Sequence, residues 1–349
     1  TFGNPTTADN ITWTLTTTAV GTDGTILPSI GAAAVTDTAG NSNAASTSTD
    51  NSVTYDASGP TVTINQSGGQ SDPSNGLPIV LDDVFSEAID PATFTSADIS
   101  QGGTATGITW SLATGDNINW TVSATAVTTE GTIIPSIGAG VLQDPSGNNN
   151  SASSSTDNSV TYDLTGPSVT INQAGAQADP TGSLPINFVV VFSEAINAAT
   201  FTNADIVNAG TAPSVTFTVT DTGDSTNFTV AASGATASGT VIPSIAASSV
   251  QDVAGNNNAA STSTDNTVTY DALPATVTIN QSGGQADPTN SLPISFDVVF
   301  SEAMDASTFT NADITQNGTA TGVTWTVVNS GDDTNYTVSR IPLTATQVN

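Results

Sequence analysis

The stretch FSEAINAATFTNADI, residues 192–206, recurs almost unchanged at two other places in the chain. Residues 85–99 read FSEAIDPATFTSADI, and residues 300–314 read FSEAMDASTFTNADI. The glutamate of this phrase moves from Glu87 to Glu194 to Glu302, in steps of 107 and 108 residues (194 − 87 and 302 − 194). Self-similarity at a fixed interval indicates a repeat array. Because the interval matches the size of an independent β-sandwich, we expect self-contained units joined in series.

A second phrase, D-N-[ST]-V-T-Y-D, closes each unit at residues 50–56, 157–163 and 265–271. A proline and an alternating V-T-I-N-Q segment follow it each time. These phrases predict two complete domains, at 58–164 and 165–272. Residues 1–57 match only the C-terminal part of such a domain, and residues 273–349 match only its N-terminal part.

Apolar and polar residues alternate within each unit, as in strands that bury one face. Residues 186–192, for example, place Ile, Phe, Val and Phe on one side. About seven such segments fall in each complete unit, and helical spacing is nowhere sustained. The fold expected is therefore all-β, of the immunoglobulin-like sandwich type. Asp83 breaks the pattern, since it occupies the inward phase held by Val190 and Val298. Solvent access or a β-bulge is the explanation we expect there.

Charge and residue usage exclude several classes of function. The formal net charge is −30 and Arg340 is the single basic residue, so nucleic acid and anionic membranes are repelled and cations are attracted. The absence of Cys and His excludes disulfides, thiolate or imidazole zinc sites and Ser-His-Asp triads. No apolar run is long enough to cross a bilayer, so we expect no membrane insertion in this segment.

The recurring phrases F-S-E-A-[IM], F-T-x-A-D-I, D-x-x-G-N and V-T-Y-D occur in one fixed order. Together they resemble the bacterial Ig-like repeats of large surface adhesins and biofilm-associated proteins, over all but the last ten residues. The resemblance implies tandem immunoglobulin-like β-sandwiches in a linear array. It also implies a structural role as a stalk or filament, an extracellular location at the cell surface, and other cells or surfaces as partners. Some relatives bind Ca²⁺ near domain junctions.

The recurring acidic residues should gather at one pole of each sandwich, because consecutive strands mostly alternate in direction. The aspartate before the linker, the glutamate after the second strand and the D-x-x-G-N loop would then meet, and the preceding unit can add the loop that carries Asp72. Ca²⁺ takes six to eight oxygen ligands in a tolerant geometry. The predicted ligands are Asp56, Glu87, Asp144 and Asn148, then Asp163, Glu194, Asp252 and Asn256, and finally Asp271 and Glu302.

A purely structural interpretation of these residues stays open. Asp-x-x-Gly-Asn is a good turn in its own right, since Asp binds the backbone and Gly takes a positive φ. The glutamate can equally end a strand in solvent. Three near-identical copies argue against an enzyme, because a catalytic site needs one pocket with perturbed pKa values. The tryptophans lie in alternating strand phases and are expected in cores rather than on sugar-binding surfaces. They are Trp13, Trp110, Trp120 and Trp325.

Two further alternatives concern partners. A carbohydrate- or surface-binding adhesive module competes with the stalk, but it should have one copy with distinct loops, and the loops here are near-identical. The terminal pieces complement each other, so identical subunits arranged head-to-tail can complete a sandwich and form a filament. The alternation of Ile341, Leu343 and Ala345 is a candidate donated strand. A segment of a longer array has the same appearance.

Overall fold

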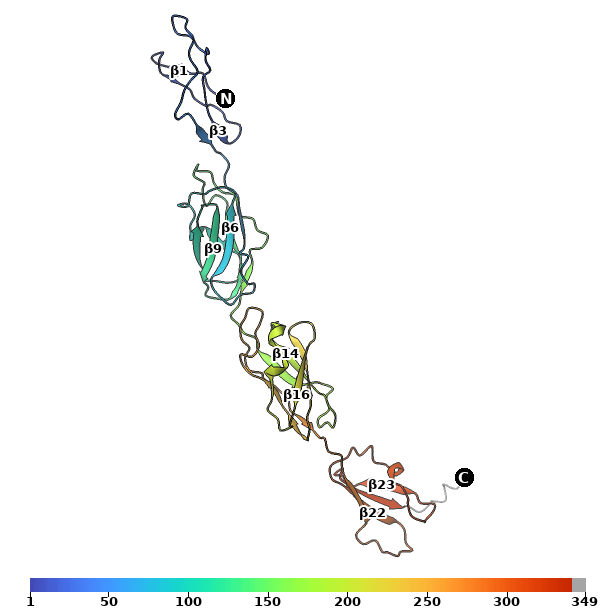
Figure 1. The fold of residues 1–349 in the computed structure, drawn as a ribbon. Coiled ribbons are helices and arrows are strands. Elements are labelled where there is room, and N and C mark those ends of the chain that lie inside the picture. Colours follow the sequence, from blue (N-terminus) through green and yellow to red (C-terminus); the bar gives the residue numbers. More distant parts are fainter. Residues whose placement is uncertain (341–349) are drawn as a thin grey trace.

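The computed structural model describes residues 1–340 and is all-β, as expected. Its helical content is limited to short 3₁₀ turns, η1 (Ser96–Asp98), η2 (Ala198–Thr200), η3 (Asn203–Asp205) and η4 (Asn311–Asp313). Figure 1 shows the successive segments following one another along one long axis, from the blue N-terminal end to the red C-terminal end. The candidate donated strand at Ile341, Leu343 and Ala345 lies outside the described residues.

Residues 58–164, here called the first complete repeat, form a four-stranded antiparallel sheet in the order β5-β6-β9-β8. Two short antiparallel pairs, β7–β11 and β10–β12, accompany it. This set of antiparallel sheets fits a β-sandwich. The strands are β5 (Val62–Gln66), β6 (Ile79–Phe85), β7 (Ile99–Gln101), β8 (Thr109–Thr114), β9 (Asn119–Ala126), β10 (Gly131–Ile133), β11 (Pro135–Ile137) and β12 (Val160–Tyr162).

Residues 165–272, the second complete repeat, reproduce this arrangement with the sheet order β13-β14-β17-β16 and the pairs β15–β19 and β18–β20. The predicted alternating strand at 186–192 coincides with β14, and its inward residues are fully buried. The strands are β13 (Val169–Gln173), β14 (Ile186–Phe192), β15 (Ile206–Asn208), β16 (Thr216–Asp221), β17 (Asn227–Ser233), β18 (Gly239–Val241), β19 (Pro243–Ile245) and β20 (Val268–Tyr270).

Each complete repeat buries its own hydrophobic cluster. One cluster draws only on residues 62–162 and the other only on residues 169–268, so both stay within the predicted domain limits. In the second, the rings of Phe192, Phe201 and Phe228 meet edge to face, with centroids 5.1 to 5.7 Å apart. Phe192 and Phe201 are the two phenylalanines of the recurring phrase. Its constancy therefore has an architectural cause, because these rings fill the core.

The terminal pieces bury far less. Residues 1–57 contain β1 (Thr6–Thr7), β2 (Trp13–Thr14), β3 (Gly24–Ile26) and β4 (Val53–Tyr55). Residues 273–340 form one sheet from β21 (Val277–Gln281), β22 (Ile294–Phe300), β24 (Asn335–Arg340) and β23 (Trp325–Asn329), in that order. Trp13 is 56% exposed, so the expectation of a core position is wrong for this tryptophan. Trp120 is buried, and Trp110 and Trp325 pack partly buried against the clusters of their own segments.

Asp83 does not behave as the sequence pattern suggested. The residue is fully buried, and it pairs in register with Ile64 on β5 and Trp120 on β9. The β5–β6 and β6–β9 ladders run through this position without a register shift. Both expected explanations, solvent access and a bulge, are therefore wrong.

Candidate metal centres at the junctions

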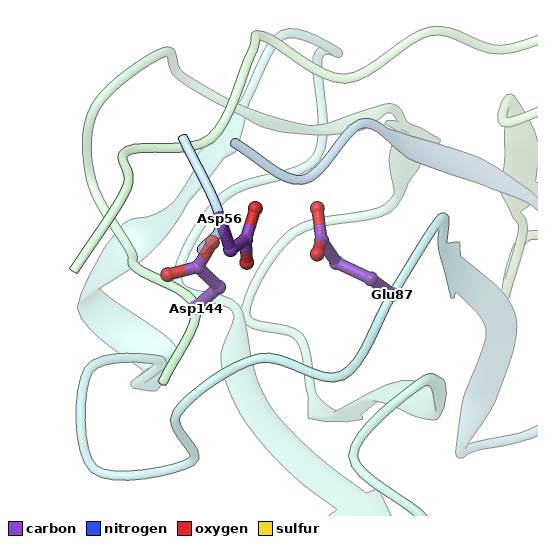
Figure 2. A group of neighbouring side chains, drawn as sticks. All are labelled: Asp56, Glu87 and Asp144. Carbon is purple, nitrogen blue, oxygen red and sulfur yellow. The ribbon is translucent and has the colours of Figure 1, made fainter. Parts of the chain in front are cut away.

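Two groups of three carboxylates can each hold a metal ion. We call Asp56, Glu87 and Asp144 the first acidic cluster, and the second acidic cluster consists of Asp163, Glu194 and Asp252. In each cluster, one oxygen from every carboxyl lies within 4.8 Å of the others. Figure 2 shows the Glu87 carboxyl directed toward those of Asp56 and Asp144.

Strand direction explains why these residues meet. Asp163 directly follows β12, the last strand of the first complete repeat, and opens the linker into β13. Glu194 comes two residues after the end of β14. Because β13 and β14 are antiparallel, the end of β14 lies beside the start of β13. The D-x-x-G-N loop reaches the same pole, where the backbone N–H of Ala259 donates to the Pro167 carbonyl at 3.0 Å. The predicted gathering at one pole is thus confirmed for both clusters.

The aspartate of the D-x-x-G-N loop is held inside a turn. Asp144 is 2% exposed, and its Oδ1 accepts from the backbone N–H groups of Ser146 at 2.8 Å and Asn148 at 2.9 Å. Its Oδ2 accepts from Asn148 Nδ2 at 2.8 Å. Burial opposes ionisation, but these hydrogen bonds outweigh it and lower the pKa of Asp144. The loop is therefore a well-formed turn that also fixes an ionised carboxylate at the junction.

The loop asparagines tie the loop to the linker. Asn148 Nδ2 donates to the Asp56 carbonyl at 3.3 Å, and Asn256 Nδ2 donates to the Asp163 carbonyl at 3.1 Å. The Oδ1 of Asn256 accepts from Nδ2 of Asn75 at 3.1 Å. The amide nitrogens thus serve the linker and the acidic residues. Metal ligation by Asn148 and Asn256 remains a prediction.

The glutamate of each cluster sits among like charges. Partial burial, followed by the charges of Asp56, Asp144 and Asp23, raises the pKa of Glu87. Burial and the charges of Asp163, Asp252 and Glu130 raise the pKa of Glu194 in the same way. A carboxylate with close anionic neighbours favours either a proton or a cation.

Glu130 and Asp23 are acidic residues that the sequence analysis missed. Glu130 belongs to the first complete repeat, and it accepts from Leu164 N at 2.9 Å and Thr165 Oγ1 at 2.7 Å, both in the linker to the next repeat. Asp23 holds Ala57 N in the same way at 2.9 Å. The register of β10 on β12 places Glu130 there: Gly131 pairs with Tyr162, so the residue before Gly131 lies opposite Asp163. The sequence alone carried no signal for this register. The equivalent residues in the three units are Asp23, Glu130 and Ser238, so this position is not part of a recurring acidic motif.

At the third junction, the structure brings Asp271 and Glu302 together as a pair. A backbone hydrogen bond from Leu273, and then the side chains of Ser238 and Glu302, lower the pKa of Asp271. The nearby Asp271 carboxyl raises the pKa of Glu302. Among residues 1–340, the other two junctions each have a group of three carboxylates that can hold a metal ion, but Asp271 and Glu302 belong to no such group.

Asp72 plays a different part from the one predicted. Its Oδ1 accepts from Thr161 N at 2.8 Å, which anchors the loop within its own repeat, and Asp72 does not join the second acidic cluster. Asn75 of the same loop makes the contact across the junction instead.

In comparisons with known proteins, no family model matches the chain, and no curated protein matches it significantly. The similarity to adhesin repeats therefore rests on the motifs alone. Within residues 1–340, no helix has the length and apolar character needed to cross a membrane.

Proposed function

We propose that the chain is a structural, extracellular repeat protein of the cell surface, without catalytic activity. In this proposal, tandem immunoglobulin-like sandwiches form a stalk or filament that contacts other cells or surfaces. Ca²⁺ at the acidic junctions fixes the angle between successive repeats. One observation carries the proposal: carboxylates from both neighbouring repeats converge on a single short linker.

The second junction shows this convergence in full. Glu130 reaches the linker from the first complete repeat, Glu194 and Asp252 approach it from the second, and Asp163 belongs to the linker itself. Two unit charges 4.8 Å apart repel by about 1 kcal/mol in water and by about 3.5 kcal/mol at an effective dielectric constant of 20. A divalent cation converts this repulsion into attraction. Its ligands would come from both repeats, so binding would restrict their relative motion.

Small-angle X-ray scattering of the full chain tests this function, with Ca²⁺ and then with excess chelator. We expect the calcium form to show one narrow distribution of maximum dimensions and the chelated form a broader and shorter one. Elemental analysis should find calcium in the first sample. Identical scattering curves together with no bound metal would overturn the proposal.

A head-to-tail filament is supported by positions that the complete repeats bury and the terminal pieces expose. Val277 and Ile279 are 56% and 54% exposed, whereas their counterparts Val169 and Ile171 are buried. In the second complete repeat, a segment at Thr262 pairs in parallel with β13 and exchanges backbone hydrogen bonds with Val169 and Ile171. Residues 1–57 contain the equivalent segment around position 47. We propose that a second copy supplies it.

Sedimentation velocity measures this association directly. We expect Val277→Asp with Ile279→Asp to abolish concentration-dependent assembly, because both changes place charges in the face that the partner would cover. Val299→Asp is the matched control, since Val299 is also an exposed valine of this sheet but lies on its other face. A wild-type chain that stays monomeric at high concentration would exclude the filament.

A further inference from the structure

Asp83 lies inside the core of the first complete repeat without a hydrogen-bond partner. Its side chain is fully buried, and neither carboxyl oxygen is bound by any group within residues 1–340. Its cross-strand neighbour Trp120 is also buried, and the indole Nε1 has no partner there either. An ionised carboxylate is very costly in such surroundings, so the neutral acid is the form that fits.

The other repeats show that the fold does not need this acid. Val190 and Val298 occupy the equivalent position on β14 and β22, and both are buried in the ordinary way. Their cross-strand neighbours are Phe228 and Tyr336 in place of Trp120. Among the three described sheets of this kind, only that of the first complete repeat carries a buried acid at this position.

No nearby charge stabilises the carboxylate form of Asp83. The adjacent strands β5 and β9 carry no titratable side chain, and Tyr162 is the only titratable residue of the surrounding core cluster. Asp82 is next in the chain and exposed on the other face of β6. Burial, and secondarily the Asp82 charge, raise the pKa of Asp83 from 3.8 to about 7.

We propose that the first complete repeat is a pH-sensitive link of the array, which is most stable at acid pH and weakens progressively as the pH rises toward neutrality. The folded pKa lies above the unfolded one, so the stabilisation is complete below pH 3.8 and is lost between pH 3.8 and about 7. Relative to a valine at this position, the unfolding equilibrium constant should increase about a hundredfold between pH 5 and pH 8. The second complete repeat lacks this response.

Tryptophan fluorescence can follow this repeat selectively in the full chain. The second complete repeat has no tryptophan, so Trp13→Phe with Trp325→Phe leaves only Trp110 and Trp120 as reporters. Urea unfolding between pH 5 and pH 8 then compares this background with Asp83→Val. The comparison cancels titrations that both chains share, such as that of Glu87.

We expect the ratio of the two unfolding constants to change about a hundredfold over this range. Asp82→Asn is the matched control, because it removes a carboxylate from the exposed face of the same strand. It should keep most of the background's pH profile, since burial is a larger cause of the raised pKa of Asp83 than the Asp82 charge. If Asp83→Val does not fold, Asp83→Asn provides the same comparison without a titrating group. A ratio that stays constant within threefold from pH 5 to pH 8 would overturn the proposal.

Discussion

Glu194→Gln should have opposite effects on stability with and without calcium. Glu194 shares the second acidic cluster with Asp163 and Asp252, and its pKa is raised by burial and by these neighbours. In the metal-free chain, the neutral amide removes repulsion and should stabilise the second complete repeat. In the calcium-bound chain, it removes a charged ligand and should destabilise that repeat.

The separations in the cluster set the size of both effects. Each of the two pairs that involve Glu194 contributes between about 1 and about 3.5 kcal/mol of repulsion, depending on the local dielectric constant. The three side chains are not all buried, so the lower end applies, and we expect a gain of about 1 to 2 kcal/mol in chelator. In the wild type, Ca²⁺ at 100 times its Kd adds about 2.7 kcal/mol, most of which the variant should lose.

Differential scanning calorimetry measures both effects as shifts in the unfolding temperature. For a domain of about a hundred residues, 1 kcal/mol corresponds to about 4 to 8 °C. Asp265→Asn is the matched control, because this exposed aspartate of the same repeat should give shifts that do not depend on calcium. Equal shifts of Glu194→Gln in calcium and in chelator would show that Glu194 does not contribute to a metal site.

Three further predictions concern the junctions and one hairpin. Gly166→Ala should weaken calcium binding and lower the unfolding temperature, because the added Cβ would lie 2.1 Å from the Asn257 carbonyl oxygen. Gly175→Ala is the control: open space surrounds this glycine, so the same calorimetric scans should show neither effect. Glu130→Gln should reduce calcium affinity about tenfold in isothermal titration calorimetry, because Glu130 holds the linker that carries the proposed metal ligand Asp163 and loss of such supporting groups typically weakens metal binding by that factor. An unchanged affinity would count against this role of Glu130. Asp116→Ala should lower the stability of the first complete repeat fully at pH 6 and much less at pH 2. Hydrogen bonds from Asn119 and Ile118, in the β8–β9 turn that holds Asp116, lower the pKa of Asp116 to about 2, so their contribution is lost as the pH falls from 3.8 toward that value. Circular dichroism melts at the two pH values provide the check, and an equal loss at both would contradict it.

The strands could be predicted from the sequence because burial imposes a period of two on each of them. Residues 186–192 illustrate this, since their alternation matches the buried face of β14 residue by residue. The gathering of Glu194 with Asp163 and Asp252 was also predictable, because it follows from strand direction alone. The immunoglobulin-like identity of the array, in contrast, stays a prediction.

The remaining features depend on contacts that a linear pattern does not contain. Glu130 acts at the junction because of the register between Gly131 and Tyr162, and register is not visible in composition. The choice between Asp72 and Asn75 depended on how one loop folds back on its own repeat. Asp83 was visible as an exception, but only its burial and missing partners show that it lies in the core.

Each complete repeat closes its own core and should therefore unfold on its own. Phe228→Ala tests it, since Phe228 is 2% exposed and contacts the rings of Phe192 and Phe201. Removing such a side chain typically costs about 3 to 5 kcal/mol. Hydrogen exchange measured by mass spectrometry on the full chain should show lost protection in residues 165–272 and unchanged protection in residues 58–164. Loss of protection that spreads equally into residues 58–164 would mean that the two repeats do not have separate cores.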